Sequence, residues 1–296
     1  MRTAFIGTSG FAATVLGRLA ASPHRPELVL TRPDAPRGRG RRLAPPPVAA
    51  AARGLGLAVI QPASVNDEAA RAAIAAAAPD VVCVCAYGGL IREPLLSSRR
   101  MLNVHPSLLP RWRGAAPIER AIMAGDERTG VSIIELTEEL DSGPILLQRD
   151  EPIGPRETYG SLAPRLAELG GELLVRALEE SPEPVRQPAD GVTYAEKIGP
   201  EDRRLDPSRP AAELERTVRA LTPHIGAWVA LSGESRLGVR LAEVVADGGG
   251  EPPGTLLVRD GAPILVCGER ALLLVAVRPP GGREMTGAEW ARGHLR

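Results

Sequence analysis

Short apolar runs alternate with helix-forming stretches along the first 180 residues of the chain. The run at 80–86 is long and continuous enough to be a strand buried on both faces. The stretch at 66–77 is rich in Ala and begins with Asn66, a residue that often caps helices. The other strand-like runs are 3–6, 27–31, 57–60, 101–104, 130–136 and 144–147. Strands that alternate with helices in this way predict an α/β domain with a doubly wound, mostly parallel sheet.

The pattern changes after a predicted long helix at 158–179. Residues 181–190 are rich in Pro and charge, which is typical of a linker. A further amphipathic helix is expected at 211–221. Short apolar runs separated by Gly- and Pro-rich turns then fill 229–277, and this spacing predicts a small β-barrel or β-sandwich.

Charge and cysteine content exclude several classes of protein. The formal net charge is zero, so a nucleic-acid partner would have to be held by a local basic patch. The three cysteines do not form a disulfide framework, and Cys83 and Cys85 are expected to be small core residues without metal or redox chemistry. No secretory segment or membrane-spanning run is evident, so we expect a cytoplasmic protein.

A glycine-containing loop at 7–10 joins the first predicted strand to the first helix. It lacks the third glycine of a dinucleotide fingerprint and the Gly-Lys-Ser/Thr of a phosphate loop. We interpret it as a tight turn beside a ligand cleft, because parallel sheets place such clefts at the carboxyl ends of their strands. A nicotinamide oxidoreductase would depend on this loop alone.

Candidate catalytic side chains lie at the end of the predicted strand at 101–104. Asn103 and His105 are two residues apart on extended chain, so both side chains face the same side. An amide donates to an oxygen that gains charge, and an imidazole carries a proton near neutral pH. Asp141 precedes the turn at 142–144, where a carboxylate near His105 would orient the ring and favour its charged form. Each residue taken alone also has a structural interpretation, such as a turn-forming Asp.

Two further segments carry candidate binding residues. The segment at 107–110 is Ser-Leu-Leu-Pro, which suits a flat aromatic ligand, and it continues into the basic and aromatic loop Arg-Trp-Arg-Gly at 111–114. The stretch at 31–43 holds five arginines and one acidic residue. Its Pro and Gly content predicts an irregular, mobile loop, and its charge suits either solvent or the phosphates of an RNA.

Taken together, these segments resemble the methionyl-tRNA formyltransferases, a branch of the 10-formyltetrahydrofolate-dependent formyltransferases. The Asn, His and Asp set with Ser-Leu-Leu-Pro belongs to the whole family, whereas the arginine loop and the flanking motifs point to the tRNA acceptor. The matching segments, which run in order along essentially the whole chain, are 7–11, 39–42, 86–88, 103–117, 129–143 and 192–198.

The resemblance implies a Rossmann-like formyltransferase domain at 1–180, a linker at 181–199 and an OB-like β-barrel that binds tRNA at 200–296. It implies a monomer that uses 10-formyltetrahydrofolate and no metal to formylate the α-amino group of initiator methionyl-tRNA. The residues concerned fall into three groups. The catalytic group is Asn103, His105 and Asp141; the folate group is Tyr87, Gly88, Ser107, Leu108, Leu109 and Pro110; the tRNA group is Arg37, Arg39, Arg41 and Arg42.

Two alternatives stay open at this point. Another formyltransferase, acting on the amine of a nucleotide-linked sugar or of a glycinamide, would share the catalytic set. A non-enzymatic RNA-binding protein would use the C-terminal barrel without formyl transfer. An assay that offers charged tRNA and an amino sugar side by side separates the three functions.

Overall fold

The computed structural model describes residues 1–37, 40, 42–231, 235–246 and 249–294. The chain divides into two compact units. The first comprises Met1–Pro117, Thr129–Pro152 and Ala163–Ala195, and the second comprises Ile118–Arg128, Ile153–Leu162 and Glu196–Arg296.

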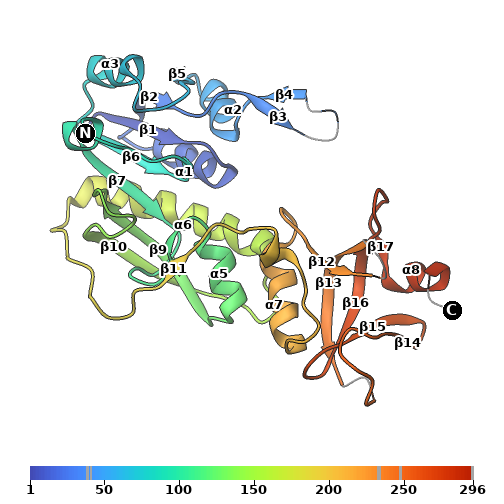
Figure 1. The fold of residues 1–296 in the computed structure, drawn as a ribbon. Coiled ribbons are helices and arrows are strands. Elements are labelled where there is room, and N and C mark those ends of the chain that lie inside the picture. Colours follow the sequence, from blue (N-terminus) through green and yellow to red (C-terminus); the bar gives the residue numbers. More distant parts are fainter. Residues whose placement is uncertain (38–39, 41, 232–234, 247–248, 295–296) are drawn as a thin grey trace. The chain divides into compact units, whose positions relative to one another are not determined.

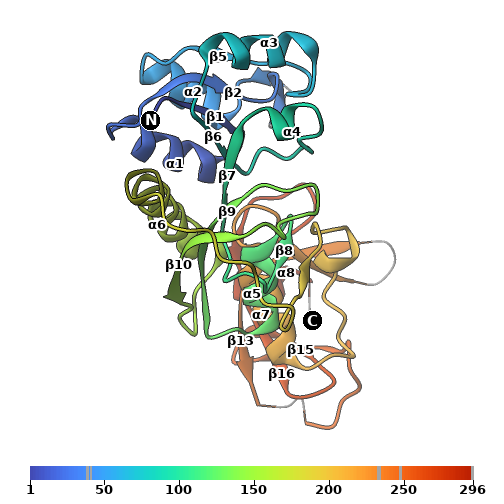
Figure 2. The same ribbon diagram turned by 90° about the vertical axis from the view of Figure 1, so that its left-hand side faces the viewer.

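A seven-stranded sheet forms the centre of the first unit, in the order β10-β9-β7-β6-β1-β2-β5. Figure 2 shows this order from β10 at the lower end to β5 at the upper end. Strands β5, β2, β1, β6 and β7 pair in parallel, whereas β9 pairs antiparallel with β7. The predicted mixed α/β unit with a mostly parallel sheet is therefore confirmed. The bounds are β1 Thr3–Gly7, β2 Pro26–Leu30, β5 Val59–Ile60, β6 Val81–Cys85, β7 Arg100–His105, β9 Arg128–Glu135 and β10 Ile145–Pro152.

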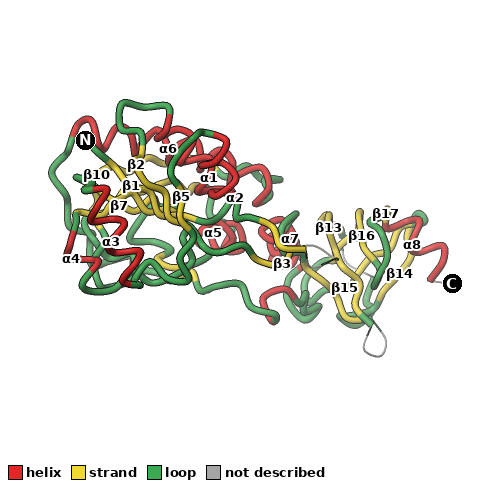
Figure 3. Tube along the Cα trace, turned by 90° about the horizontal axis from the view of Figure 1, so that it is seen from above, coloured by secondary structure: helices red, strands yellow, loops and turns green. Residues whose placement is uncertain are grey.

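Helices cover both faces of this sheet. Helices α1 (Gly10–Ala20), α2 (Pro47–Gly54) and α6 (Tyr159–Glu180) lie on one side of the strands, and α3 (Glu68–Ala77) and α4 (Leu95–Ser98) lie on the other (Figure 3). Strand residues alternate between the two faces, so Ala4 and Ile6 join the apolar cluster that also holds Ile74 of α3 and Leu95 of α4. Burial on both faces explains why these strands consist of continuous apolar runs.

Two local predictions are wrong. The arginine stretch is not irregular throughout, because β3 (Ala35–Arg37) and β4 (Arg42–Ala44) form an antiparallel hairpin, labelled in Figure 1. Pro36 is tolerated there because this ribbon has only two strands, so a residue without an N–H need not break a ladder on both sides. Asn66 does not cap α3; its side chain donates to Leu90 O and accepts from the N–H of Arg92, and α3 begins after Asp67.

The second unit is rich in β-structure, as expected. Helix α7 (Ala211–Leu221) packs through Leu214 and Val218 into a core shared with the strands of a sheet ordered β12-β13-β16-β15-β14. The bounds are α5 Pro117–Ala124, β12 Ala227–Ala230, β13 Arg236–Val245, β14 Leu256–Arg259, β15 Ala262–Val266, β16 Ala271–Arg278, β17 Met285–Thr286 and α8 Gly287–His294. Among the described residues of both units, no helix combines the length and apolar character needed to cross a membrane.

Candidate active site

The carboxyl ends of three neighbouring parallel strands, β1, β6 and β7, meet at one edge of the first sheet. Gly7 at the end of β1 pairs with Cys85 at the end of β6, and Val84 of β6 pairs with Asn103 of β7. The loops are tied together, since the Thr8 hydroxyl donates to Tyr87 O at 2.9 Å. A Cβ on Gly7 would lie 2.7 Å from Cys85 O, so this glycine allows close packing of the turn. The edge is the position where open α/β sheets bind their ligands.

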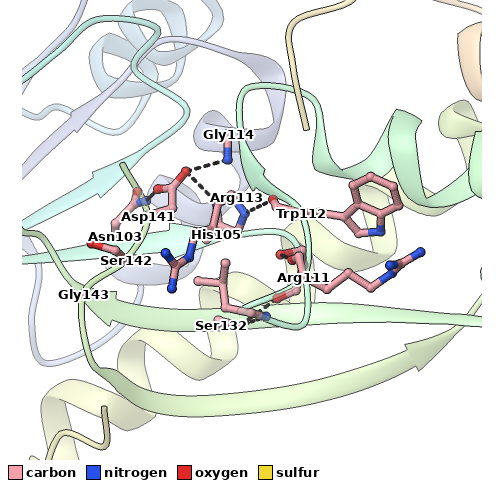
Figure 4. A network of polar contacts seen from close by, with 12 residues as sticks. Asn103, His105, Arg111, Trp112, Arg113, Gly114, Ser132, Asp141, Ser142 and Gly143 are labelled. Carbon is pink, nitrogen blue, oxygen red and sulfur yellow. Dashed lines mark hydrogen bonds and ion pairs between the residues drawn. The ribbon is translucent and has the colours of Figure 1, made fainter. Parts of the chain in front are cut away.

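The Asp141 carboxylate is the centre of a polar cluster at this edge (Figure 4). Asp141 Oδ1 accepts from the Asn103 amide at 3.2 Å, and Oδ2 accepts from the Gly114 N–H at 2.9 Å. Oδ2 also lies 3.5 Å from Nδ1 of His105. Asp141 and His105 are both buried, and Asn103 is half-buried. The three residues singled out from the sequence are thus brought together across 38 positions of chain.

The turn that carries Asp141 has an unusual backbone. Asp141 itself has φ +48°, a left-handed conformation that Asp adopts more readily than most residues. Two residues later, a Cβ on Gly143 would overlap the carbonyl oxygen of Glu135, so only glycine fits. Such local strain persists because the surrounding contacts hold the turn in place.

Both ring nitrogens of His105 face polar atoms. Nε2 lies 2.9 Å from the carbonyl oxygen of Trp112, which can only accept a hydrogen bond, so Nε2 carries a hydrogen. Nδ1 faces the Asp141 carboxylate. Trp112 has φ +66°, and this left-handed conformation is part of the turn that aims its carbonyl at the imidazole (Figure 4).

Gln187 is a buried site residue that the sequence interpretation missed. Its Nε2 donates to Asp141 O and to Gly143 O, both at 2.8 Å. Its Oε1 accepts from Nε and Nη2 of Arg113, at 3.0 and 2.7 Å. Nothing in the pattern around position 187 marked this residue, because its partners lie 44 to 74 positions away in the sequence.

The candidate folate residues lie beside the cluster in two different environments. Ser107 and Leu109 are buried, and the Ser107 hydroxyl donates to Arg111 O at 2.7 Å, so it closes the 107–111 loop. Leu108 and Pro110 are half-buried. Tyr87 is buried, with its hydroxyl accepting from the Val65 N–H, and Gly88 is exposed in a left-handed conformation.

The candidate tRNA arginines are only partly covered by the structure. Arg42 lies on β4 with its side chain exposed. Arg37 ends β3, and its side chain is outside the description, while Arg39 and Arg41 lie outside the described residues altogether.

The cysteines are core residues, as predicted. Cys83 and Cys85 are fully buried in β6, and burial raises the pKa of the Cys83 thiol to about 12. In the part of the chain that the structure describes, no group of three or more His, Cys, Asp or Glu side chains is arranged to hold a metal ion.

Comparison with known proteins defines the class. The formyl transferase family model matches residues 1–178, and the model of the formyl transferase C-terminal domain matches residues 197–295. The chain belongs to the formyl transferase family. Within it, the chain is 46% identical to the methionyl-tRNA formyltransferase of Aromatoleum aromaticum, over 99% of this chain and 94% of that protein. It is also 46% identical to the methionyl-tRNA formyltransferase of Halorhodospira halophila, over 99% of this chain and 96% of that protein.

Solved structures share the fold at lower sequence identity. HypX from Aquifex aeolicus, solved in complex with tetrahydrofolic acid, gives a TM-score of 0.68 at 20% identity. The match covers 100% of this chain but 48% of HypX. The N-formyltransferase of Helicobacter canadensis, solved with folinic acid and dTDP-3-aminofucose, gives 0.66 at 12% identity over 93% of this chain and 98% of that one. At these identities, the two structures show that the fold is shared.

Proposed function

We propose that the protein transfers a formyl group from 10-formyltetrahydrofolate to the α-amino group of initiator methionyl-tRNA, giving N-formylmethionyl-tRNA for translation initiation. The observation that carries the chemistry is the Asp141 carboxylate, which joins Asn103 and His105 at the carboxyl edge of the sheet. The acceptor follows from the near-full-length relatives at 46% identity that are named methionyl-tRNA formyltransferase.

The reaction exchanges one C–N bond for another. The methionyl amine forms a bond to the formyl carbon, the bond from that carbon to the folate nitrogen breaks, and the proton lost by the amine ends on the departing nitrogen. Charge develops on the formyl oxygen between these events, so fixed donors aimed at that oxygen lower the barrier.

Asn103 has one N–H available for this task beyond the one that it gives to Asp141 Oδ1, because an amide carries two. The Nε2–H of His105 is the second donor. It bonds Trp112 O in the structure, so substrate binding exchanges that carbonyl for the formyl oxygen. Asp141 orients the imidazole through Nδ1 and receives the proton from the attacking amine, directly or through water.

Folate binding is assigned to the loops beside this cluster. The half-buried Leu108 and Pro110 offer apolar surface to a pterin ring. Gly88 is exposed, and its carbonyl oxygen accepts from the Arg32 guanidinium, so this loop offers a polar edge. Tyr87, Ser107 and Leu109 support the pocket from behind, since their side chains are buried.

The acceptor is assigned to Arg37, Arg39, Arg41 and Arg42 and to the C-terminal region. We assign residues 1–180 to the catalytic domain, 181–199 to the linker and 200–296 to an OB-like tRNA-binding domain. The protein acts as a cytoplasmic monomer, and its sedimentation behaviour tests the oligomeric state.

The deciding experiment follows labelled formyl from 10-formyltetrahydrofolate into methionyl-tRNA, with a nucleotide-linked amino sugar offered in a parallel reaction. We expect label in the tRNA alone. Label in the sugar alone would replace the proposed acceptor, and label in neither would remove the proposed function.

A further inference from the structure

The side chain of Gln187 uses its full hydrogen-bonding capacity within the first unit. A primary amide has two N–H donors and two acceptor lone pairs. Both donors are directed at carbonyl oxygens, of Asp141 and Gly143, and both acceptor positions face the Arg113 guanidinium. The residue is 7% exposed, so these groups have replaced water almost completely. Leaving any of them unpaired is therefore costly.

The partners of Gln187 are the two turns that build the Asp141 cluster. One turn is 141–143, which carries the carboxylate. The other is 112–114, whose Trp112 carbonyl faces His105 and whose Gly114 N–H bonds Asp141 Oδ2. Asp141 and Trp112 both have positive φ, so neither turn is in a conformation that the chain prefers on its own. Gln187 links the two turns, through backbone carbonyls of the first and through the Arg113 side chain of the second.

Hydrogen bonds from residues on either side of Gln187 connect this segment to the same two regions of the chain. Val185 exchanges two hydrogen bonds of 2.8 Å with Ile145, just after the Asp141 turn. Thr193 accepts the Trp112 N–H on its hydroxyl, at 2.9 Å, and its carbonyl accepts the Arg113 N–H, also at 2.9 Å. Strand β11 (Tyr194–Ala195) then pairs with β8 (Arg113–Gly114). Residues 185–195, which follow α6 in the proposed linker, therefore form a wall of the cluster.

We infer that Gln187 is a positioning residue for formyl transfer, and this inference rests on the proposed function. It acts through the backbone of Asp141 and sets where the carboxylate meets His105 and Asn103. The chemistry requires an amide at this position. A glutamate would keep, and strengthen, the contact with Arg113, but it would present acceptors to two carbonyl oxygens that need donors.

Two substitutions separate positioning from stability. Gln187→Glu removes the two donors and keeps the guanidinium partner, whereas Gln187→Met removes all four bonds at similar volume. Gln61→Met is the matched control, because Gln61 Nε2 donates to Arg32 O and Gln61 Oε1 accepts from Arg53, away from the Asp141 cluster.

The experiment measures kcat and KM for each substrate across pH, the melting temperature, and the hydrogen exchange of the Gly114 amide. Because a shift of about 1 Å in a reacting group costs up to about 100-fold in rate, we expect both Gln187 variants to lose about 10-fold or more in kcat. The KM for 10-formyltetrahydrofolate stays within about twofold of the wild-type value, because the substitutions leave the residues assigned to folate binding in place. The pH profile of kcat changes shape, and the Gly114 amide exchanges faster while amides of β1 keep their protection. Gln61→Met keeps the wild-type kcat and pH profile.

The outcomes separate the two proposals. A wild-type protein that formylates methionyl-tRNA while Gln187→Glu keeps its kcat and its pH profile overturns the positioning role alone. A fall in melting temperature with normal kcat in the folded protein does the same. A wild-type protein without activity overturns the proposed function, and unchanged Gly114 exchange in the variants then also removes the role of Gln187 in holding the cluster.

Discussion

The turn that carries Asp141 and the hairpin that carries Arg42 belong to the same unit, but they are organised in opposite ways. Around Asp141 the groups are buried, and carboxylate, amide, imidazole and backbone each have a designated partner within 3.5 Å. On the hairpin, Arg42 is exposed. A buried, preorganised cluster stabilises charge strongly because it need not reorganise during the reaction. An exposed cation attracts a phosphate weakly and in a salt-dependent manner, so it contributes to RNA binding only together with other basic residues.

The largest effect on kcat is expected from substitutions in the buried Asp141 cluster. Asp141→Asn keeps the size of the side chain but removes the charge that faces His105 Nδ1, and His105→Ala removes the ring. Removing one preorganised group of this kind typically lowers kcat by about 10²–10³-fold, and we expect a loss of that size in each variant. Steady-state formylation of methionyl-tRNA measures it.

Retained folate binding and a retained melting temperature are the controls for these variants. Near-normal turnover in both of them would show that the cluster is structural. The difference in burial between the Asp141 cluster and the hairpin would then say nothing about catalysis.

The second effect tests whether the turn at 141–143 requires a glycine at position 143. Gly143→Ala places a methyl group against the Glu135 carbonyl, and overpacking of this kind destabilises a protein by about 1–3 kcal/mol. Chemical denaturation measures the change in the free energy of unfolding. Gly17→Ala is the matched control, since it lies within α1 with nothing within 4 Å of the added Cβ, and we expect it to stabilise by about 0.5–1 kcal/mol. Equal effects at the two positions would contradict the tight fit at Gly143.

How far the sequence predicts these two regions depends on the range of the interactions. The spacing of Asn103 and His105 places both side chains on one face of a strand, and the apolar runs identify the strands, because both are local properties of extended chain. Gln187 was missed since four hydrogen bonds from an irregular segment to distant turns leave no periodic signal. The hairpin at 35–44 was missed because Pro and Gly suggest irregularity, whereas a two-stranded ribbon accommodates Pro36.

A smaller effect is expected on the hairpin. Arg42→Glu should raise the KM for methionyl-tRNA and reduce the salt dependence of binding by about one unit of the log–log slope, with kcat unchanged, because a phosphate contact positions the substrate without entering the reaction. Binding measured over a series of salt concentrations tests it. Arg99→Glu, an exposed arginine after α4, is the control for charge reversal in general. A loss of kcat in Arg42→Glu with unchanged tRNA binding would place the hairpin in the catalytic machinery and remove the contrast.

The smallest effect concerns two buried cysteines of β6 that have no assigned task, of which Cys85 lies at the same sheet edge as the Asp141 cluster. Burial raises the pKa of Cys83 to about 12, so this thiol is almost fully protonated at pH 8. Burial also raises the pKa of Cys85, the last residue of β6. We therefore expect neither thiol to react with iodoacetamide at pH 8 in the folded protein, and both to react in denaturant, as read by mass spectrometry of labelled peptides. Rapid labelling of Cys85 in the folded protein would show that the carboxyl end of β6 opens to solvent. The preorganisation assigned to the neighbouring Asp141 cluster would then have to be maintained by the two turns and Gln187 without support from a closed sheet edge.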